Sequence, residues 1–267
     1  MEAPVIVDSA TRLGAGSRGK VAVCGSHGGV NAGWLAAKAG VRGIVLNDAG
    51  IGRHSAGTAG IAWLDALGIA ACAVDYRSAR IADGADMLAN GIVSVANETA
   101  ALLGCLPGHS CREVVQCMIA NAKPSEREVP DIGEARTRIA NSGHRPVWAI
   151  DSMALGQASD SRAVMITGSH GGLLGGKPDT NLTMDIFAAF FNDAGGGKDD
   201  AGFARLPLLD SRGVAGATVS HNTARIGDAR STYETGVLSR INETARRLEL
   251  REGMSAREAV ARLVGLG

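Results

Sequence analysis

The sequence lacks an excess of charge of either sign, because 27 lysines and arginines balance 27 aspartates and glutamates. Without a basic surface, the protein is not expected to bind nucleic acid or an anionic membrane by counterion release. Aromatic residues make up only 3% of the chain, so side chains that stack on bases or sugar rings are scarce. These scarcities predict a small molecule as the partner, and they leave a homo-oligomer open.

The five cysteines also lack the spacing of a disulfide framework or a zinc motif. Their number is odd and no two of them form a CxxC pair. The most apolar window, residues 60–74, is interrupted by Asp65 and is too short to span a bilayer. The N-terminus shows no signal-peptide pattern. Together these absences predict a cytoplasmic protein with reduced cysteines and no membrane segment.

Motifs for nucleotide cofactors are missing as well. The chain has no P-loop pattern, and no G-x-G-x-x-G segment follows a predicted strand. A nucleotide cofactor is therefore not expected. A divalent metal ion stays an alternative, because histidines and aspartates on separate loops could bind one, although no HExxH spacing supports it.

What the sequence does contain is an internal repeat. Residues 21–29, VAVCGSHGG, recur as VMITGSHGG at residues 164–172. Residues 47–115 align with residues 192–260 without a gap, so that each residue lies 145 positions before its counterpart. The segments NDAG and NETA are identical in both copies. The chain is therefore predicted to be a tandem duplication.

Each repeat is predicted to form an α/β unit, because short apolar strands alternate with helices. We expect two homologous repeats with mostly parallel sheets, related by a pseudo-twofold axis. Residues 1–118 would form the first repeat and residues 146–267 the second, joined by a polar bridge at 119–145 with a short helix near 132–140. The expected strands are residues 5–7, 20–24, 43–46 and 70–74, and then 148–150, 163–167, 187–191 and 215–219.

The two GSHGG segments are the main candidates for a ligand site. Ligands of parallel sheets bind beyond the carboxyl ends of the strands, and both segments follow a predicted strand. Gly28 and Gly171 would expose backbone amides to an anion. Ser169 and His170 would act as nucleophile and base, or as oxyanion donor and acid. The alternative is a tight turn between a strand and a helix, without a ligand.

Further polar residues follow the third strand of each repeat. Asn47 and Asp48 are predicted to contact the substrate, and their counterpart Asp193 is predicted to orient His170 or to act as a base. The sequence Asn-Asp-Ala-Gly is also typical of turns, so a turn without a ligand is the alternative for both copies.

An arginine precedes an aspartate by three residues in each repeat, as Arg80 before Asp83 and Arg225 before Asp228. Each arginine would hold a substrate carboxylate through two hydrogen bonds, or would pair with its aspartate as a structural ion pair. In the first case Asp228 is a second candidate for orienting His170.

The differences between the repeats predict that the second one carries the proton chemistry. His221 stands where the first repeat has Tyr76, and Asp199 stands where it has His54. Histidine titrates near neutral pH, whereas tyrosine does not. Neutral drift of a redundant copy is the alternative explanation.

Taken together, these residues predict a small-molecule enzyme, a hydrolase that acts on a carboxylate- or amide-containing metabolite by general acid–base chemistry between the repeats. The alternatives are a metal-dependent lyase or isomerase and a non-catalytic protein that binds a small anion. The candidate catalytic residues are Ser169, His170, Asp193, His221 and Asp228. The candidate substrate-binding residues are Ser26, His27, Gly28, Asn47, Asp48, Arg80, Gly171 and Arg225.

Overall fold

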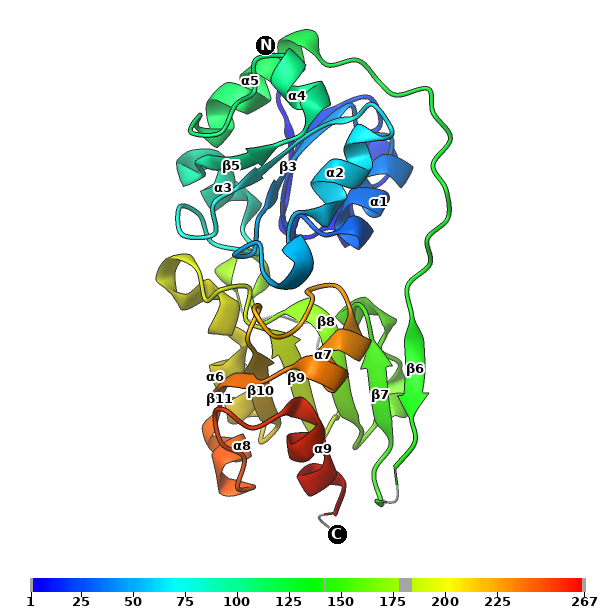
Figure 1. The fold of residues 1–267 in the computed structure, drawn as a ribbon, viewed down its shortest axis with the longest axis vertical. Helices are drawn as coiled ribbons and strands as arrows, with labels where there is room; N and C mark the ends of the chain where they lie inside the picture. Colours follow the sequence, from blue (N-terminus) through cyan, green and yellow to red (C-terminus); the bar gives the residue numbers. More distant parts are fainter. Residues whose placement is uncertain (1, 142, 178–183, 266–267) are drawn as a thin grey trace.

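The computed structural model describes residues 2–141, 143–177 and 184–265, and this part of the chain contains two sheets (Figure 1). The first sheet has five strands in the order β1-β2-β3-β4-β5, and the second has six in the order β11-β10-β9-β8-β7-β6. Strands β1 to β4 are parallel to one another, as are β7 to β10, and β5, β6 and β11 run antiparallel to their neighbours. The predicted α/β class with mostly parallel sheets is confirmed.

The strands are β1 (Val5–Val7), β2 (Val21–His27), β3 (Gly43–Asn47), β4 (Ala70–Val74), β5 (Val93–Ala96), β6 (Arg136–Ile139), β7 (Val147–Ile150), β8 (Val164–His170), β9 (Ala188–Asn192), β10 (Ala215–Val219) and β11 (Leu238–Ile241). The α-helices are α1 (Val30–Lys38), α2 (Ala59–Asp65), α3 (Gly84–Asn90), α4 (Glu98–Leu102), α5 (Cys111–Asn121), α6 (Arg205–Ser211), α7 (Ala229–Thr235), α8 (Glu243–Arg247) and α9 (Ala256–Gly265).

Both sheets are buried on both faces, as their continuous apolar strands require. In the first half, α1 and α2 cover one face and α3, α4 and α5 cover the other (Figure 1). In the second half, α7, α8 and α9 cover one face, whereas α6 and the apolar residues Met184 and Ile186 cover the other. Among the described residues, none of the helices has the length and apolar character needed to cross a membrane.

The helix expected after the second GSHGG segment is not found in the described part of the chain. In the first half, α1 begins directly after Gly29. In the second half, the described residues after Gly172 form only a 3-10 turn, Leu174–Gly176. Residues 178–183, which follow this turn and Lys177, lie outside the described residues. One face of the second sheet therefore lacks a described counterpart of α1.

The bridge between the halves differs from the prediction of a short helix near 132–140, which is wrong. Residues 136–139 form strand β6, which pairs antiparallel with β7 and extends the second sheet. Tertiary contacts favour the strand, because the guanidinium of Arg136 pairs with the buried carboxylate of Asp160 at 2.7 Å. Residues 122–135 have no regular structure and run along the outside of the molecule between the two sheets (Figure 1).

Strands β2 and β8 extend further than the sequence predicts, through the histidine of each GSHGG segment. A glycine makes this possible, because a Cβ on Gly25 would lie 2.6 Å from the backbone nitrogen of Asp83. The loop that crosses the strand there donates the Ala82 N–H to the Gly25 carbonyl at 2.7 Å. Gly168 accepts the Gly227 N–H in the same way, also at 2.7 Å. Each Ser-His pair thus lies on a strand end rather than on a turn.

The contacts between the two halves are reciprocal. The Arg53 N–H donates to the carbonyl of His221 at 2.7 Å, and the Lys198 N–H donates to the carbonyl of Tyr76 at 2.9 Å. In the aligned sequence, Arg53 corresponds to Lys198 and Tyr76 to His221. The apolar centre of the interface likewise consists of three corresponding pairs, Ala49 and Ala194, Ala56 and Ala201, and Ile81 and Ile226.

Candidate functional site

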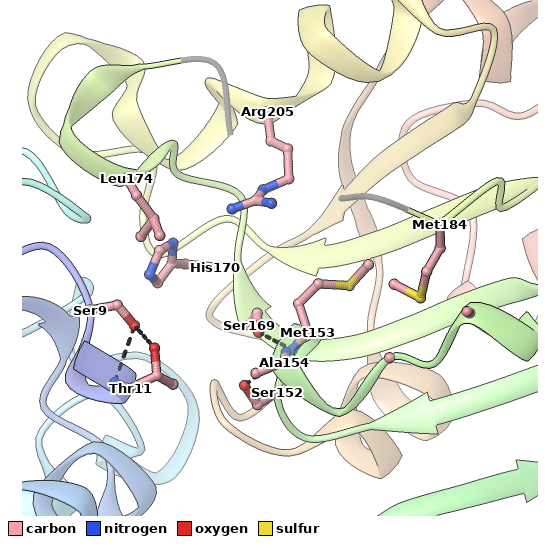
Figure 2. A pocket seen from close by; sticks show the side chains of 12 residues that line it. Ser9, Thr11, Ser152, Met153, Ala154, Ser169, His170, Leu174, Met184 and Arg205 are labelled. Atoms are coloured by element: carbon pink, nitrogen blue, oxygen red, sulfur yellow. Dashed lines mark hydrogen bonds between the residues drawn. The ribbon is translucent and has the colours of Figure 1, made fainter. Parts of the chain in front are cut away.

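A cleft lies between the two halves, where the carboxyl ends of β2 and β8 meet. It consists of a cavity of about 380 Å³ on the side of the second half and a smaller one of about 70 Å³ beside it. The two cavities share Ser9, Thr11, Ser152, Ser169 and His170 as lining residues. In Figure 2, Ser9 and Thr11 approach from the first half and face His170 of the second. We call the two cavities together the cleft.

Two serines of the cleft are held by backbone N–H groups. The Ser169 hydroxyl accepts the Met153 N–H at 2.9 Å, and the Ser26 hydroxyl accepts the Ala10 N–H at 2.9 Å. The donors belong to two short 3-10 turns that follow β1 and β7, Ala10–Arg12 and Met153–Leu155. A hydroxyl has one proton and two lone pairs, so each of these serines keeps its proton and one lone pair for a further partner. The backbone bond fixes the position of the oxygen.

The two histidines of the GSHGG segments face each other across the interface, with their ring centroids 6.5 Å apart and their planes at 82°. The Nδ1 of His27 accepts the Gly29 N–H at 3.0 Å, and the Nδ1 of His170 accepts the Gly172 N–H at 3.1 Å. A neutral imidazole has one donor and one acceptor nitrogen, so the proton of each ring is on Nε2. Both imidazoles are fixed as Nε2–H donors.

Their surroundings keep both rings neutral. Burial lowers the pKa of His27 to about 4. Burial, and then the nearby His27 and the positive charge of Arg205, lower the pKa of His170 to about 3. Removal from water disfavours the charged imidazolium, which is the main cause in both cases. At neutral pH these residues can donate a hydrogen bond but are poor bases.

Arg205 adds a positive charge to the larger cavity. Its side chain is only 5% exposed, and its guanidinium donates to the carbonyl of Gly172 at 2.9 Å. Figure 2 shows the side chain extending from α6 into the space between His170 and the methionines of the opposite wall. The cleft therefore combines a cation, two imidazole N–H groups and serine hydroxyls. These donors suit a carboxylate or another oxyanion. The smaller cavity is also lined by Asp151, whose carboxylate accepts the N–H groups of Ala135 and Ala229.

The backbone amides of Gly28 and Gly171 do not face a ligand. They donate to the carbonyls of Asn47 and Asn192, at 2.7 and 3.0 Å. The next amides, those of Gly29 and Gly172, donate to the Nδ1 atoms of His27 and His170. In the structure these amides therefore fix the imidazole tautomers and do not form the predicted binding site for an anion. Asn47 itself is fully buried, and its amide donates to the carbonyl of Ala79 at 3.2 Å.

Asp193 and His221 form a pair of their own, away from His170. The carboxylate of Asp193 contacts the Nδ1 of His221 at 3.0 Å. Burial alone would raise the pKa of Asp193, but the hydrogen bonds from His221 and from backbone N–H groups hold it below the usual range. Neither residue is among those that line the cleft. The described contacts do not include one between Asp193 and His170, and the Nδ1 of that ring accepts the Gly172 N–H instead.

The corresponding carboxylate of the first half has the opposite pKa shift. Burial raises the pKa of Asp48, although its carboxylate accepts hydrogen bonds from Ser94 at 2.7 Å and from the backbone N–H groups of Gly50 and Tyr76, both at 3.0 Å. The replacement of Tyr76 by His221 thus gives the second half a carboxylate–imidazole pair that the first half does not have.

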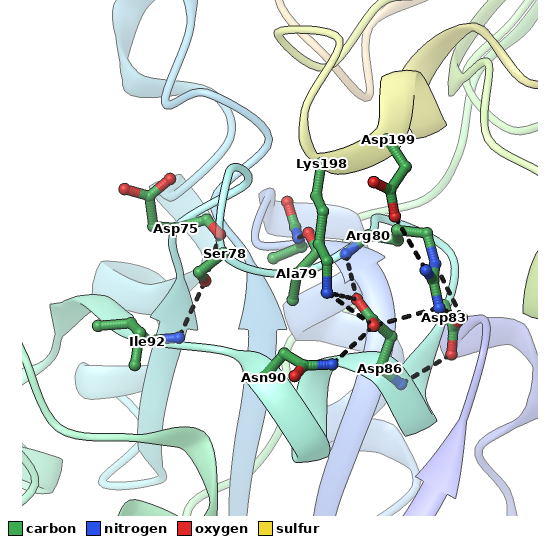
Figure 3. A network of polar contacts seen from close by, with 11 residues as sticks. Asp75, Ser78, Ala79, Arg80, Asp83, Asp86, Asn90, Ile92, Lys198 and Asp199 are labelled. Carbon is green, nitrogen blue, oxygen red and sulfur yellow. Dashed lines mark hydrogen bonds and ion pairs between the residues drawn. The ribbon is translucent and has the colours of Figure 1, made fainter.

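Arg80 lies in an ion-pair network that connects the two halves (Figure 3). Its guanidinium contacts Asp83 and Asp86 of its own half, both at 3.1 Å, and Asp199 of the other half at 3.0 Å. The ammonium of Lys198 also reaches Asp86, at 2.9 Å. Arg80 thus contributes to the interface, and it is not among the residues that line the cleft.

Arg225 and Asp228 pair with each other in the second half. Asp228 also caps α7, because its carboxylate accepts the Ser231 N–H at 2.8 Å. These contacts correspond to the structural alternative considered for both residues, and they do not place Asp228 against His170.

No group of three or more histidine, cysteine, aspartate or glutamate side chains that could hold a metal ion occurs among the described residues. Comparisons of the chain with protein-family models, with curated proteins and with solved structures found no match. The candidate function therefore depends on the geometry of the cleft alone.

Several residues of the cleft are not among the candidate site residues chosen from the sequence. Ser9 and Ser152 follow the first strand of each half as a repeated Asp-Ser pair, which is a detectable signal. Arg205 could also have been noticed in the sequence, because an arginine stands there where the aligned first half has Gly60. Met153 and Met184 have none, since apolar residues occur throughout the core.

Proposed function

We propose that the protein binds a small carboxylate- or amide-containing metabolite in the cleft and hydrolyses a C–N or ester bond of it. The observation that carries the proposal is the meeting of two neutral imidazole N–H donors from different halves. A neutral imidazole that donates to a carbonyl oxygen polarises the carbonyl and stabilises the negative charge that develops on it. In this proposal His27 and His170 hold the carbonyl oxygen while the Ser169 hydroxyl attacks the carbonyl carbon. As the C–N or ester bond breaks, the hydroxyl proton passes to the leaving nitrogen or oxygen, and water then releases the acid from the serine ester.

The same geometry favours a second candidate, a non-catalytic protein that binds a small anion. A serine nucleophile must lose its proton to a base. The described contacts give Ser169 no such partner, because the Nε2 of His170 carries a proton in the observed tautomer. A cleft whose serine has no base among its described contacts matches an anion receptor.

The interface supports a proposal about the history of the chain. We propose that the halves are homologous repeats related by a pseudo-twofold axis, derived from a symmetric dimer by duplication. The reciprocal backbone hydrogen bonds and the three corresponding apolar pairs are what such an origin would leave. We further propose a cytoplasmic location, which agrees with five cysteines that are all free thiols.

Ligand binding is tested by a thermal-shift screen against a pool of small metabolites, since a ligand that binds the native state raises the melting temperature. Hits are then incubated with the protein and followed by mass spectrometry. Consumption of an amide or ester with release of the acid supports the hydrolase. Tight binding without any product supports the anion-binding protein and contradicts the hydrolase.

Once a substrate is known, His170→Ala is expected to lower kcat roughly 10²-fold, the loss found when one oxyanion donor is removed. The matched change His27→Ala compares the two halves, and His54→Ala at an exposed position serves as the control. Because both rings stay neutral, the rate should show no titration of His27 or His170 between pH 5 and 8. Steady-state kinetics over this pH range measure both effects. A normal kcat in both histidine variants would contradict the proposal.

A further inference from the structure

Four of the five cysteines gather between the first sheet and the helices α4 and α5. Cys72 lies on β4, Cys105 follows α4, and Cys111 and Cys117 lie on α5. They belong to one apolar cluster, in which Cys117 is half-buried and the other three are fully buried. All four are free thiols. We call these four residues the thiol cluster.

The packing of the fold does not require sulfur at these places. In the aligned second half, the counterparts of the thiol cluster are Ala217, Leu250, Ala256 and Arg262. The three apolar counterparts are as buried as the cysteines that they match, at no more than 1% exposed. A buried cysteine often serves only as a small apolar residue. Because alanine and leucine fill the same positions in the second half, the four sulfurs of the first half indicate a chemical role.

Two members of the thiol cluster are neighbours through one short segment of chain. The Sγ of Cys117 donates to the carbonyl of Leu103 at 2.6 Å, and a Cβ on Gly104 would lie 4.0 Å from that sulfur. Cys105 is the next residue, and its Sγ donates to the carbonyl of Val114, one helical turn before Cys117, at 3.7 Å. The thiols of Cys105 and Cys117 also hydrogen-bond to each other. The two sulfurs are therefore already side by side.

The surroundings divide the thiols into reactive and inert ones. Hydrogen bonds from Cys72 and Cys117 lower the pKa of Cys105 to about 7, although burial acts against them. The pKa of Cys117 is raised by burial and by its hydrogen bond to Cys105. At neutral pH this pair shares a thiolate, the form of cysteine that oxidants attack. Burial raises the pKa of Cys111 to about 12, so this thiol stays protonated.

We propose that Cys105 and Cys117 are a site of reversible oxidation, at which a small hydroperoxide joins their sulfurs in a disulfide. Cys117 is the half-buried member of the pair and meets the oxidant, whereas Cys105 lies in the core beside it. Disulfides that form inside cells are usually transient and respond to the redox state. The proposal does not depend on the cleft, because neither residue is among those that the structure describes as lining it.

The oxidation proceeds in two displacements. Cys117 gives its proton to the Cys105 thiolate, and its sulfur attacks one oxygen of the peroxide. The O–O bond breaks, which leaves the sulfenic acid of Cys117 and a hydroxide that takes the proton back from Cys105 as water. The Cys105 thiolate then attacks the sulfenic sulfur and displaces a second hydroxide, which solvent protonates. The peroxide is reduced to two waters and the two sulfurs are oxidised to the disulfide, which a dithiol reductant reverses.

The test treats the reduced full chain with hydrogen peroxide, blocks the remaining thiols with iodoacetamide and maps the tryptic peptides by mass spectrometry. Arg112 lies between Cys105 and Cys117 in the sequence, so trypsin separates the two cysteines unless a disulfide joins them. We expect a joined peptide that disappears on treatment with dithiothreitol. The oxidised protein should also unfold at a higher urea concentration than the reduced one, because the disulfide restricts the unfolded chain.

Three variants assign the sulfurs. Cys117→Ser and Cys105→Ala should each abolish the joined peptide and the peroxide-dependent gain in urea resistance. Cys111→Ala is the matched control, since Cys111 is on the same side of Arg112 as Cys105, and it should form the joined peptide as the wild type does. Circular dichroism shows whether each variant is folded. Cys117→Ser changes a half-buried position, so it tests the proposal even if Cys105→Ala does not fold.

Three results would overturn the proposal. One is a Cys117 that peroxide converts to sulfinic acid while Cys105 remains free. Another is a disulfide that joins Cys105 to Cys72, or one that is lost in Cys111→Ala. The third is a protein whose Cys117 reacts with iodoacetamide before and after peroxide alike, without any joined peptide. None of these results bears on the proposed hydrolase, which is tested by the turnover of a substrate.

Discussion

Lowering the pH from 7 to 5 is expected to reduce the free energy of unfolding by about 4 kcal/mol through His27 and His170. The unfolded chain takes up protons on both imidazoles below a pKa of about 6.5. The folded protein does not, because burial holds the pKa of His27 at about 4 and that of His170 at about 3. The unfolded state therefore binds more protons as the pH falls, and stability decreases with it. The decrease occurs between pH 6.5 and the folded pKa values.

The measurement is chemical denaturation at pH 7, 6 and 5, with the double variant His27→Asn, His170→Asn for comparison. The Asn side-chain oxygen can replace Nδ1 as acceptor for the N–H groups of Gly29 and Gly172, and it does not titrate. We expect the double variant to lose most of the pH dependence. His54→Asn, at an exposed position, should keep it. A wild-type stability that is the same at pH 7 and pH 5 would show that the rings are not held neutral by the fold.

Gly202→Ala and its counterpart Gly57→Ala are each expected to lower the free energy of unfolding by about 4 kcal/mol or more. A Cβ on Gly202 would overlap the carbonyl oxygen of Asp193, and one on Gly57 would overlap that of Asp48. These oxygens belong to the backbone, so no side-chain rotation relieves the clash. Overpacking of this kind distorts the main chain, and losses above 4 kcal/mol come from such a mechanism.

The consequence for the cleft is direct, because the carbonyl oxygen of Gly202 lies against Gly171, next to His170. Gly16→Ala is the matched control, since a Cβ there meets nothing within 4 Å, and its effect should stay within about 0.5 kcal/mol. Urea denaturation compares the three variants. If Gly202→Ala is as stable as Gly16→Ala, the packing of the NDAG loop against the GSHGG strand is looser than described.

The sequence by itself determined the features that depend on near neighbours in the chain. Short apolar runs alternating with helices fixed the parallel α/β class, because such strands are stable only when both faces are covered. The capping box of Ser110 and Glu113 lies at the start of α5, since a cap needs only residues three positions apart. Asn97 and Asn242, each in an NETA segment, cap α4 and α8 for the same reason.

Only the tertiary structure decided the chemistry of the cleft. Whether His170 is a base or a donor depends on which nitrogen its surroundings leave protonated, and the Gly172 N–H settles that with burial. Asp193 pairs with His221 because the loop after β10 places both the N–H and the ring of His221 against its carboxylate. Residues 136–139 became a strand because β7 offered an unpaired edge, which no local pattern reveals. Hydrogen-bond partners and burial come from residues far apart in the chain, so the sequence alone does not show which ring nitrogen of His170 carries the proton.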